Sequence, residues 1–320
     1  PAPPTCRAGC SWGLPGAIYA TGLVEAWIAI GLTIGAWLNW KFVAPRLRAY
    51  TEVANNSITI PPSFFDNRLR DPAHLLRIAA GLIVLVFFTF YVSSGMVAGG
   101  TFFESSFGLD YLTGLLVVGG GVTLAYTLFG GFLGATWTDV AQGLLMLAAL
   151  VAVPVIAIVD LGGWGAMTEG IRAADAATGT NHLSFLAGGA SATGVISALA
   201  WGLGYFGQPH IIVRFMAIRT PPQDAKAGRR IGIGWMVLTA LGAVMTGLVG
   251  VAYATVKGLD VDNPPETIFL VLAQLLFHPL VAGLVLAAVL AAIMSTISSQ
   301  LIVSSSALVE DLVKMTGGSG

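Results

Sequence analysis

The chain has 320 residues, of which 56% are hydrophobic and only 10% are charged, and its formal net charge is −1. A soluble domain normally carries about 25% charged residues, so this composition argues against a water-soluble globular domain. The near-neutral charge also gives no electrostatic reason to expect a nucleic acid as a partner. We therefore predict an all-α protein that lies in a lipid bilayer.

The first residues of the chain contain its two cysteines, Cys6 and Cys10. A C-x-x-x-C pair with no second pair and no nearby histidine is a poor zinc site, so we interpret the two as incidental thiols. A basic segment followed by an apolar core is also missing here, and we predict no cleavable signal peptide. Membrane insertion must then depend on the apolar spans themselves.

Apolar stretches of membrane-spanning length follow one another along the chain. A helix needs about 20 apolar residues to cross about 30 Å of hydrocarbon. Seven stretches meet this length: Ala17–Trp40, Leu76–Ala98, Leu112–Leu133, Val140–Val159, Ala192–Phe215, Ile231–Val256 and Leu280–Val303. A shorter apolar piece around Trp12–Tyr19 predicts half of an eighth span. Its Gly13-Leu14-Pro15-Gly16 cannot continue a regular helix, because Pro15 lacks a backbone donor.

Lys and Arg residues predict the orientation of these spans. Six of the 15 lie between Lys41 and Arg77, and five more lie between Arg214 and Arg230. Both segments are therefore expected on the cytoplasmic side. We predict one membrane domain over residues 1–320, with a cytoplasmic loop at 41–77 and an outer loop at 160–190.

Three residues in the last span could bind a monovalent cation. Ala292 lies three and four residues before Ser295 and Thr296, so the three share one face of a helix. Two hydroxyls and a backbone carbonyl are hard oxygen ligands that bring no full charge into the membrane. The alternative is that both hydroxyls bond to carbonyls one turn back, or join neighbouring helices.

The span Ala192–Phe215 contains a segment that a straight helix does not favour. Trp201 through His210 includes three glycines and Pro209. We predict a broken helix, which is tolerated at membrane depth only against protein or a wet cavity, and whose half-helix ends suit a zwitterionic substrate. Trp201 and Tyr205 are four residues apart and are expected to stack on one face. The alternative is an interfacial aromatic pair beside a packing kink.

Other polar residues in or near the spans have two interpretations each. Tyr126 fits core packing or a binding site. Asp139 fits an N-terminal cap of the next helix or a role in ion coupling. Glu25 near an outer end fits a structural or a gating role. Arg214 fits an anchor or one half of a cytoplasmic gate, and His210 is a weak candidate for a proton relay.

The chain contains no phosphate-binding glycine loop, no H-E-x-x-H motif and no G-x-S-x-G elbow. These patterns are typical of nucleotide-dependent enzymes, zinc peptidases and serine hydrolases. We therefore expect no enzyme and no organic cofactor.

Several long strings resemble one transporter family. They are Glu25 to Thr33, Gly130 to Leu133 with Trp137-Thr138-Asp139, Trp201 to His210 with Arg214 to Ala217, and Met294-Ser295-Thr296. In this order they resemble the sodium/proline symporter branch of the solute:sodium symporter family, from about Gly13 to Lys314.

The resemblance implies a LeuT-type fold of two inverted five-helix repeats, with ion and substrate at broken helices. It implies sodium as coupling ion, bound by Ala292, Ser295 and Thr296, and a small amino acid, above all proline, as substrate. It places substrate contacts at Gly13, Tyr126, Trp201, Tyr205 and Pro209. Glu266 and Arg214 match family positions whose roles stay open, and the expected location is the cell membrane.

The N-terminal string departs from the family. The family has an S-D-M-S-G-W-type string before the Gly-Leu-Pro-Gly motif, and this chain instead reads Pro3 to Trp12 with Arg7 in it. An arginine near a cation site would repel sodium, so we expect residues 1–12 to be frame-shifted. Relative to the family we also expect an incomplete bundle. A sensor module and a non-functional transporter fragment are therefore alternative interpretations.

Overall fold

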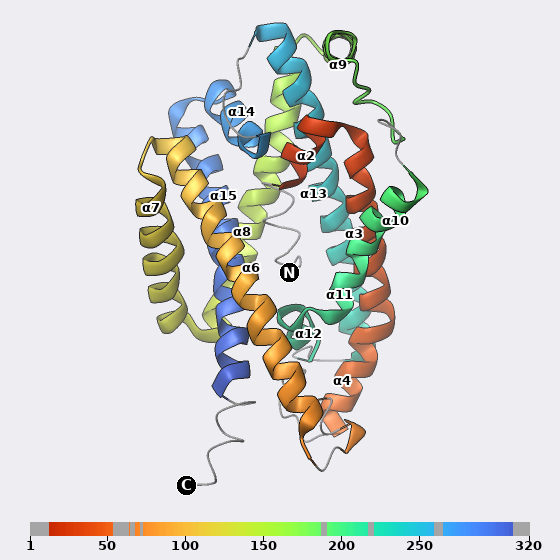
Figure 1. Cartoon of the computed structure of the whole chain (residues 1–320), viewed down its shortest axis with the longest axis vertical. Coiled ribbons are helices and arrows are strands. Elements are labelled where there is room, and N and C mark those ends of the chain that lie inside the picture. Colours follow the sequence, from red (N-terminus) through yellow and green to blue (C-terminus); the bar gives the residue numbers. More distant parts are fainter. Residues whose placement is uncertain are drawn as a thin grey trace.

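The computed structural model describes residues 13–53, 64, 68–70, 73–186, 191–216, 221–258 and 265–309. Within these ranges all regular secondary structure is helical, and the long helices run roughly side by side along one axis (Figure 1). The hypotheses about Cys6, Cys10, Arg7 and a frame shift in residues 1–12 lie outside the described residues.

The first apolar stretch divides at a glycine. Helix α2 (Leu14–Thr21) ends at Gly22, whose φ of +88° is a conformation that glycine adopts without strain. A 3₁₀ turn, η2 (Leu23–Glu25), then leads into α3 (Ala26–Leu38). The predicted single span Ala17–Trp40 is therefore wrong in its boundaries, whereas the predicted short helix before it is present as α2.

The chain continues past α3 without leaving the helical conformation. A π-helical turn, η3 (Asn39–Val43), connects α3 to α4 (Ala44–Val53). The predicted cytoplasmic loop 41–77 thus begins as the end of a helix, and α6 (Leu75–Phe107) starts within its last residues.

Helical backbone also covers the two predicted spans Leu112–Leu133 and Val140–Val159. Helix α7 (Tyr111–Gly114), π-helical η4 (Leu115–Val122) and α8 (Thr123–Asp160) follow one another directly. Asp110 caps α7 by accepting the Thr113 N–H. Figure 1 shows the ribbon running down from α7 and returning upward along α8, so the two spans are antiparallel as expected.

The second half of the chain contains one broken helix and two long ones. Its elements are α9 (Trp164–Thr178), α10 (Ala192–Ala200), η6 (Trp201–Leu203), α11 (Gly204–Gly207), α12 (Pro209–Met216), α13 (Pro221–Lys257), η7 (Pro265–Thr267), α14 (Ile268–Leu276) and α15 (Pro279–Ser306). Helices α9 and α14 were not predicted. The first lies in the predicted outer loop, and the second is too short for a span.

Five helices among the described residues are long and apolar enough to cross a membrane: Leu23–Val53, Leu75–Phe107, Asp139–Asp160, Lys226–Lys257 and Pro279–Val309. Two shorter apolar helices, Ala192–Gly207 and Pro265–Leu276, accompany them. The predicted span Ala192–Phe215 is divided, as the prediction of a broken helix requires, and Ala192–Gly207 is its longer apolar part. Large apolar side chains such as Phe87 and Phe90 of α6 are 67% and 72% exposed, which fits a surface in contact with lipid.

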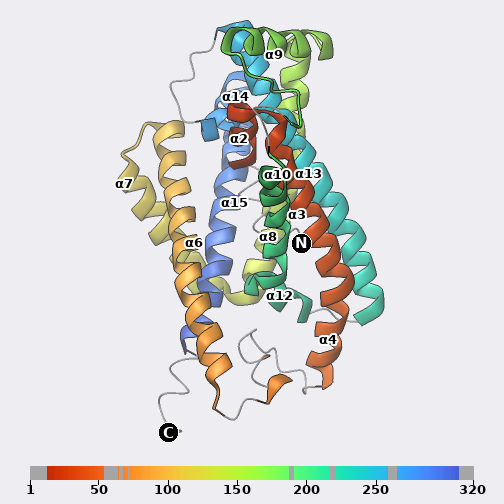
Figure 2. The same ribbon diagram turned by 45° about the vertical axis from the view of Figure 1, so that its right-hand side comes forward.

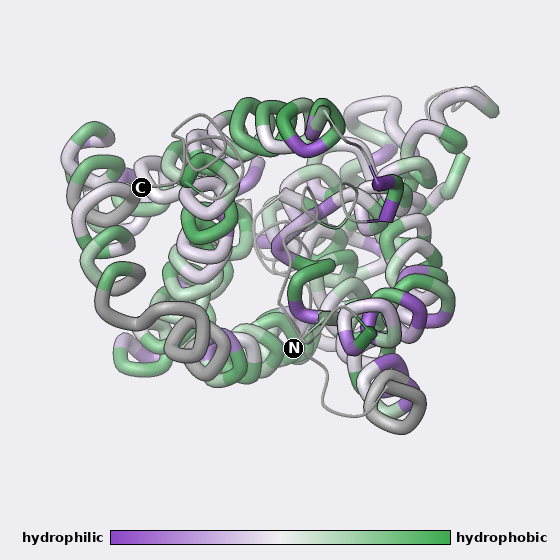
Figure 3. The backbone as a smooth tube through the Cα atoms, turned by 90° about the horizontal axis from the view of Figure 1, so that it is seen from below, coloured by the Kyte–Doolittle hydropathy of each residue, from purple (hydrophilic) through white to green (hydrophobic). Residues whose placement is uncertain are grey.

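The two ends of the bundle can be named after the predicted orientation, which stays a prediction. Helix α4 lies at one end, α12 lies in the same half of the bundle, and α9 lies at the other end in both side views (Figures 1 and 2). Viewed from the end with the basic segments, most helical positions are hydrophobic or neutral (Figure 3). We call the end with α4 the cytoplasmic end and the end with α9 the outer end.

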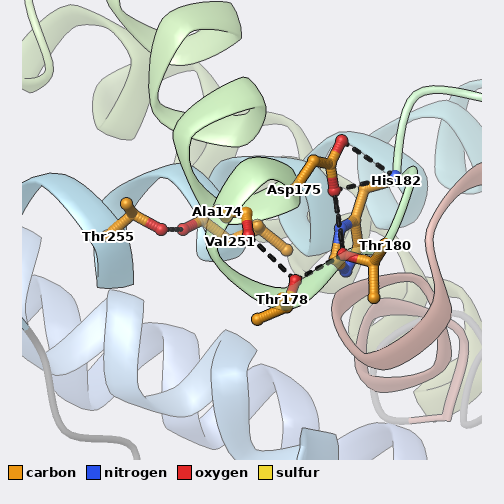
Figure 4. Close-up of polar contacts among 7 residues, drawn as sticks. All are labelled: Ala174, Asp175, Thr178, Thr180, His182, Val251 and Thr255. Atoms are coloured by element: carbon orange, nitrogen blue, oxygen red, sulfur yellow. Dashed lines mark hydrogen bonds and ion pairs between the residues drawn. The ribbon is translucent and has the colours of Figure 1, made fainter.

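The outer loop after α9 lies against the break between α2 and α3. The His182 carbonyl accepts the Leu23 N–H at 2.8 Å, and the Trp27 indole donates to the Phe185 carbonyl at 3.0 Å. A Cβ on Gly22 would collide with the His182 backbone. Asp175 fixes this loop, because its carboxylate accepts the His182 N–H and contacts the His182 Nδ1 at 2.5 Å (Figure 4).

Candidate sodium and substrate site

The predicted cation ligands lie together on the buried face of α15. The Ser295 and Thr296 hydroxyls both donate to the Ala292 carbonyl, at 3.1 Å and 2.9 Å. All three residues are at most 4% exposed, so none of them faces lipid. The alternative of bonding one turn back is thus present in the structure. It leaves lone pairs on both hydroxyl oxygens, which can still face a cation, whereas the Ala292 carbonyl already accepts both hydroxyl protons and would have to give up one of these bonds to bind an ion.

The polar character of this helix continues beyond the predicted ligands. Ser298, Ser299 and Gln300 are also at most 5% exposed. Burying polar side chains in a membrane helix is costly unless they are satisfied, and such residues commonly mark a path for ions or substrate. The sequence interpretation singled out Ala292, Ser295 and Thr296 but gave no role to the following turn.

The predicted broken helix is confirmed in its geometry. Helix α11 ends at Gly207, Gln208 is extended with φ −87° and ψ 107°, and α12 begins at Pro209. Proline cannot donate to a preceding turn and disfavours helical backbone in the residue before it. The break therefore falls at Gln208, at the residue before the proline.

The two aromatic residues before the break lie in different surroundings. Tyr205 is 2% exposed, and its hydroxyl lies 3.9 Å from the Met236 sulfur of α13. Trp201 in η6 is 62% exposed. The expected stacking of the two rings on one face is therefore wrong, because a side chain so open cannot share the buried environment of Tyr205.

The other predicted substrate residues are Gly13, Pro209 and Tyr126, and the structure describes the surroundings of the first two. Gly13 precedes α2 and is exposed, and Pro209 is buried at the start of α12. Tyr126 lies in α8, but its side chain is outside the described part of the structure. A common pocket for all five predicted substrate residues stays a prediction.

An ion pair joins two residues that the sequence treated separately. The Arg214 Nη2 of α12 lies 2.5 Å from the Asp139 Oδ2 of α8 and donates to the Ser299 hydroxyl of α15 at 3.1 Å. The Asp139 side chain is fully buried, and that of Arg214 is 15% exposed. The interpretation of Asp139 as an N-terminal cap is wrong, because it lies inside α8 and pairs with Arg214.

This ion pair lies on the cytoplasmic side of the predicted cation ligands. Ser299 follows Ser295 by four residues and Thr296 by three, so it is displaced along α15 by about 6 Å from the first and about 4.5 Å from the second. Helix α15 ends near the cytoplasmic end of the bundle (Figure 2). The pair therefore connects three helices about one turn below the candidate cation site, where a cytoplasmic closure is expected.

Glu25 and Glu266 both belong to the outer end of the bundle. Glu25 is half-buried in η2, directly after the Gly22 break. The backbone of Glu266 in η7 packs on α2, where a Cβ on Gly16 would lie 2.6 Å from its Cα. A gating or coupling role for Glu25 and Glu266 stays a prediction.

Two polar residues of the site escaped the sequence interpretation. Ser299 bonds to Arg214, and Asn39 is fully buried and donates from Nδ2 to the Tyr205 carbonyl at 2.7 Å. Asn39 could have been found, because it is a polar residue within an apolar span and such residues are functional candidates by default. His210, by contrast, is buried with its ring at 5.4 Å from that of Phe88, which gives no support to a proton relay.

A multi-pass helical bundle that buries hydroxyl groups on one helix and breaks another is typical of secondary transporters. Residues 7–316 match the profile of the sodium:solute symporter family, and the chain belongs to this family. It is a multi-pass membrane protein.

Curated relatives support the same family. The chain is 57% identical over 302 residues to the high-affinity proline transporter PutP of Bacillus subtilis, covering 94% of this chain and 62% of the relative. It is 54% identical over 302 residues to the osmoregulated proline transporter OpuE of the same organism, covering 94% and 60%. It is 53% identical over 306 residues to a sodium/proline symporter of Staphylococcus aureus, covering 96% and 58%. The chain thus spans about three fifths of these relatives' length.

A solved structure shows the same fold. A Na⁺-coupled sialic acid symporter, in a substrate-bound outward-open state, matches 99% of this chain and 66% of its own chain, with a TM-score of 0.78 at 18% sequence identity. The predicted LeuT-type fold is therefore confirmed.

Proposed function

We propose that this protein works as a sodium-coupled symporter that takes up a small amino acid, with proline as the favoured substrate, across the cell membrane. The observation that carries the proposal is the buried group of three oxygens from Ala292, Ser295 and Thr296 on α15. Relatives that are 53–57% identical are named proline transporters or sodium/proline symporters, which supports the choice of substrate.

The three oxygens suit sodium because they are hard ligands without full charge. A carboxylate ligand would hold a cation tightly, whereas a coupling ion must also be released. Hydroxyl and carbonyl dipoles favour a monovalent cation and allow it to leave. Transport needs no covalent chemistry, so the proposal includes no catalytic residue and no organic cofactor.

The proposed substrate site lies at the break between α11 and α12. Its proposed contacts are Gly13, Tyr126, Trp201, Tyr205 and Pro209. The extended Gln208 interrupts the helix there, and the N-terminal end of α12 favours a carboxylate.

Coupling follows if the ion and the solute favour the same conformation. Sodium then raises the affinity for the solute, and the solute raises the affinity for sodium by the same factor. We propose the Arg214–Asp139 pair as part of the cytoplasmic closure, and Glu25 and Glu266 as residues of the outer closure.

The test is a Thr296→Val variant of the complete gene product, reconstituted in proteoliposomes. Valine keeps the shape of threonine and removes the hydroxyl ligand. We expect the sodium concentration for half-maximal proline uptake to rise by about tenfold or more, which corresponds to about 1.4 kcal/mol.

Thr255→Val is the matched control, because the Thr255 hydroxyl of α13 makes the same bond one turn back, to the Val251 carbonyl at 2.9 Å. It should leave sodium activation unchanged. Unaltered sodium activation in Thr296→Val would contradict the ion site, and absence of sodium-dependent uptake by the unmodified protein would contradict the function.

A further inference from the structure

Helix α3 packs on the broken helix with backbone against backbone. A Cβ on Gly31 would lie 2.5 Å from the Leu199 carbonyl oxygen of α10, and one on Gly35 would collide with the Gly202 carbonyl of η6. A pair of glycines four residues apart lets two membrane helices approach this closely. The two elements therefore contact each other at successive turns.

Asn39 continues the line of contacts that Gly31 and Gly35 make with the broken helix, and we call these three residues the seam. It follows Gly35 by four residues, as Gly35 follows Gly31, and it meets Tyr205, which follows Gly202 by three residues. Here the contact is a hydrogen bond from Asn39 Nδ2 to the Tyr205 carbonyl, 2.7 Å long and fully buried. The seam of Gly31, Gly35 and Asn39 thus ends on the last turn before the break.

The chemistry of Pro209 explains why an amide is needed at this point. In an uninterrupted helix the Tyr205 carbonyl would accept the N–H of residue 209. Residue 209 is proline and has no N–H, so the helix itself cannot supply that donor. In a membrane the missing donor must come from protein or water, because lipid offers none. The Asn39 carboxamide supplies it from a neighbouring helix.

We propose that Asn39 is a positioning residue for substrate binding, which holds the Tyr205 carbonyl in place of the donor that Pro209 lacks. This inference rests on the proposed function and deepens it. Asn39 acts through Tyr205 and Pro209 and does not touch the substrate. Its bond fixes the last turn of α11, which carries the Tyr205 ring, relative to α3 and η3.

The first experiment separates positioning from general stability. In proteoliposomes, Asn39→Leu removes the donor and nearly keeps the side-chain volume. We expect the KM for proline to rise by about tenfold, while maximal uptake per mole of folded protein changes by less than about threefold. A purely structural role would lower the amount of folded protein and leave the KM as it was.

Thr33→Val is the matched control on α3. The Thr33 hydroxyl donates to the Ala29 carbonyl at 2.8 Å, within its own helix. This variant should keep the KM of the unmodified protein. A wild-type KM in Asn39→Leu would overturn the proposal, even with sodium-dependent proline uptake intact.

The second experiment restores the missing donor. Pro209→Ala gives residue 209 an N–H that can reach the Tyr205 carbonyl, so Asn39→Leu should change the KM and the unfolding temperature much less in that background. Such non-additivity is the signature of a shared interaction. Equal effects of Asn39→Leu in both backgrounds would overturn the proposal.

The unfolding temperatures of the two single variants and of the double variant also separate this inference from the proposed function. If the unmodified protein shows no proline uptake, the function fails, and non-additive unfolding still supports the Asn39 bond while additive unfolding refutes it. If Asn39→Leu cannot be purified alone, its recovery in the Pro209→Ala background supports the proposal. Failure in both backgrounds contradicts it.

Discussion

Asp175 shows how a single side chain outside the membrane spans fixes a loop. Its carboxylate accepts hydrogen bonds from the His182 N–H at 3.1 Å and from the Thr180 hydroxyl at 3.0 Å. Through His182 this loop reaches Leu23, directly after the Gly22 break. The conformation of the outer end of α3 therefore depends on a carboxylate in α9.

The ionised form of Asp175 stabilises the fold. Burial of the carboxyl acts to raise its pKa, but hydrogen bonds from the His182 side chain and backbone and from Thr180 outweigh burial, so the pKa of Asp175 lies below its ordinary value of 3.8. A lowered pKa in the folded state means that this stabilisation is complete above the ordinary value and is lost as the pH falls below it.

We predict that Asp175→Asn removes part of the acid sensitivity of the protein. Between pH 5 and pH 3 the unfolding temperature should fall less in Asp175→Asn than in the unmodified protein, because the variant has no carboxylate to protonate at this position. Thermal unfolding in detergent across this pH range measures the difference. Glu169→Gln, an exposed change on the same helix, is the control, and an equal fall in both variants would refute the prediction.

Residue identities alone led to one wrong and one missed interpretation. Asp139 follows Thr138 in a pattern that suits a helix cap, but its partner Arg214 is 75 positions away. Asn39 and Tyr205 are 166 positions apart. Contacts of this kind depend on how helices cross, and no local pattern contains that information.

At the scale of elements, the breaks were more predictable than the helix boundaries. The break at Gln208 follows from Pro209 and its glycine neighbours, which act locally. The division of Ala17–Trp40 at Gly22 was missed, because one glycine in an apolar run is also common inside membrane helices. What ends α2 there is the outer loop, whose His182 backbone occupies the space beside Gly22.

Helices α8, α12 and α15 are joined by the buried pair of Asp139 and Arg214, and we predict that breaking this pair destabilises the bundle. Asp139→Asn leaves the Arg214 charge without its anion in a largely buried position, which costs about 3 kcal/mol or more. Adding Arg214→Gln should recover part of the loss, because the uncompensated charge is then gone. Thermal or denaturant unfolding in detergent measures all three proteins.

The Lys257–Asp160 pair provides a matched control for this prediction. Its N–O distance is 3.3 Å, but both side chains are 44% exposed. Exposed ion pairs contribute about 1 kcal/mol or less, so Asp160→Asn should have only a small effect. Similar losses of stability in Asp139→Asn and Asp160→Asn would contradict the prediction that the buried pair stabilises the bundle more than the exposed pair does.

For the whole molecule, composition predicted the class correctly, and the orientation inferred from charge stays a prediction. The apolar runs indicated a membrane bundle, and the basic segments lie at one end of it (Figure 2). Apolar composition and the distribution of basic residues are each summed over many positions, so an error in one helix boundary hardly changes them. Placement of the substrate residues depends on a few side chains and was only partly predictable.

The orientation can be tested with two small substitutions in a background whose Cys6 and Cys10 are replaced. Ala176→Cys lies on exposed α9 at the outer end, and Ala73→Cys lies before α6 at the cytoplasmic end. A membrane-impermeant maleimide should label Ala176→Cys in intact cells, and Ala73→Cys only after permeabilisation. The reverse pattern would refute the orientation.

The bonds of Ser295 and Thr296 to the Ala292 carbonyl have a consequence for α15 when its buried face holds no ion. Because both hydroxyl protons already have an acceptor in their own helix, departure of an ion strands no donor in the hydrocarbon. Both side chains are therefore satisfied as donors within α15 whether or not an ion is bound.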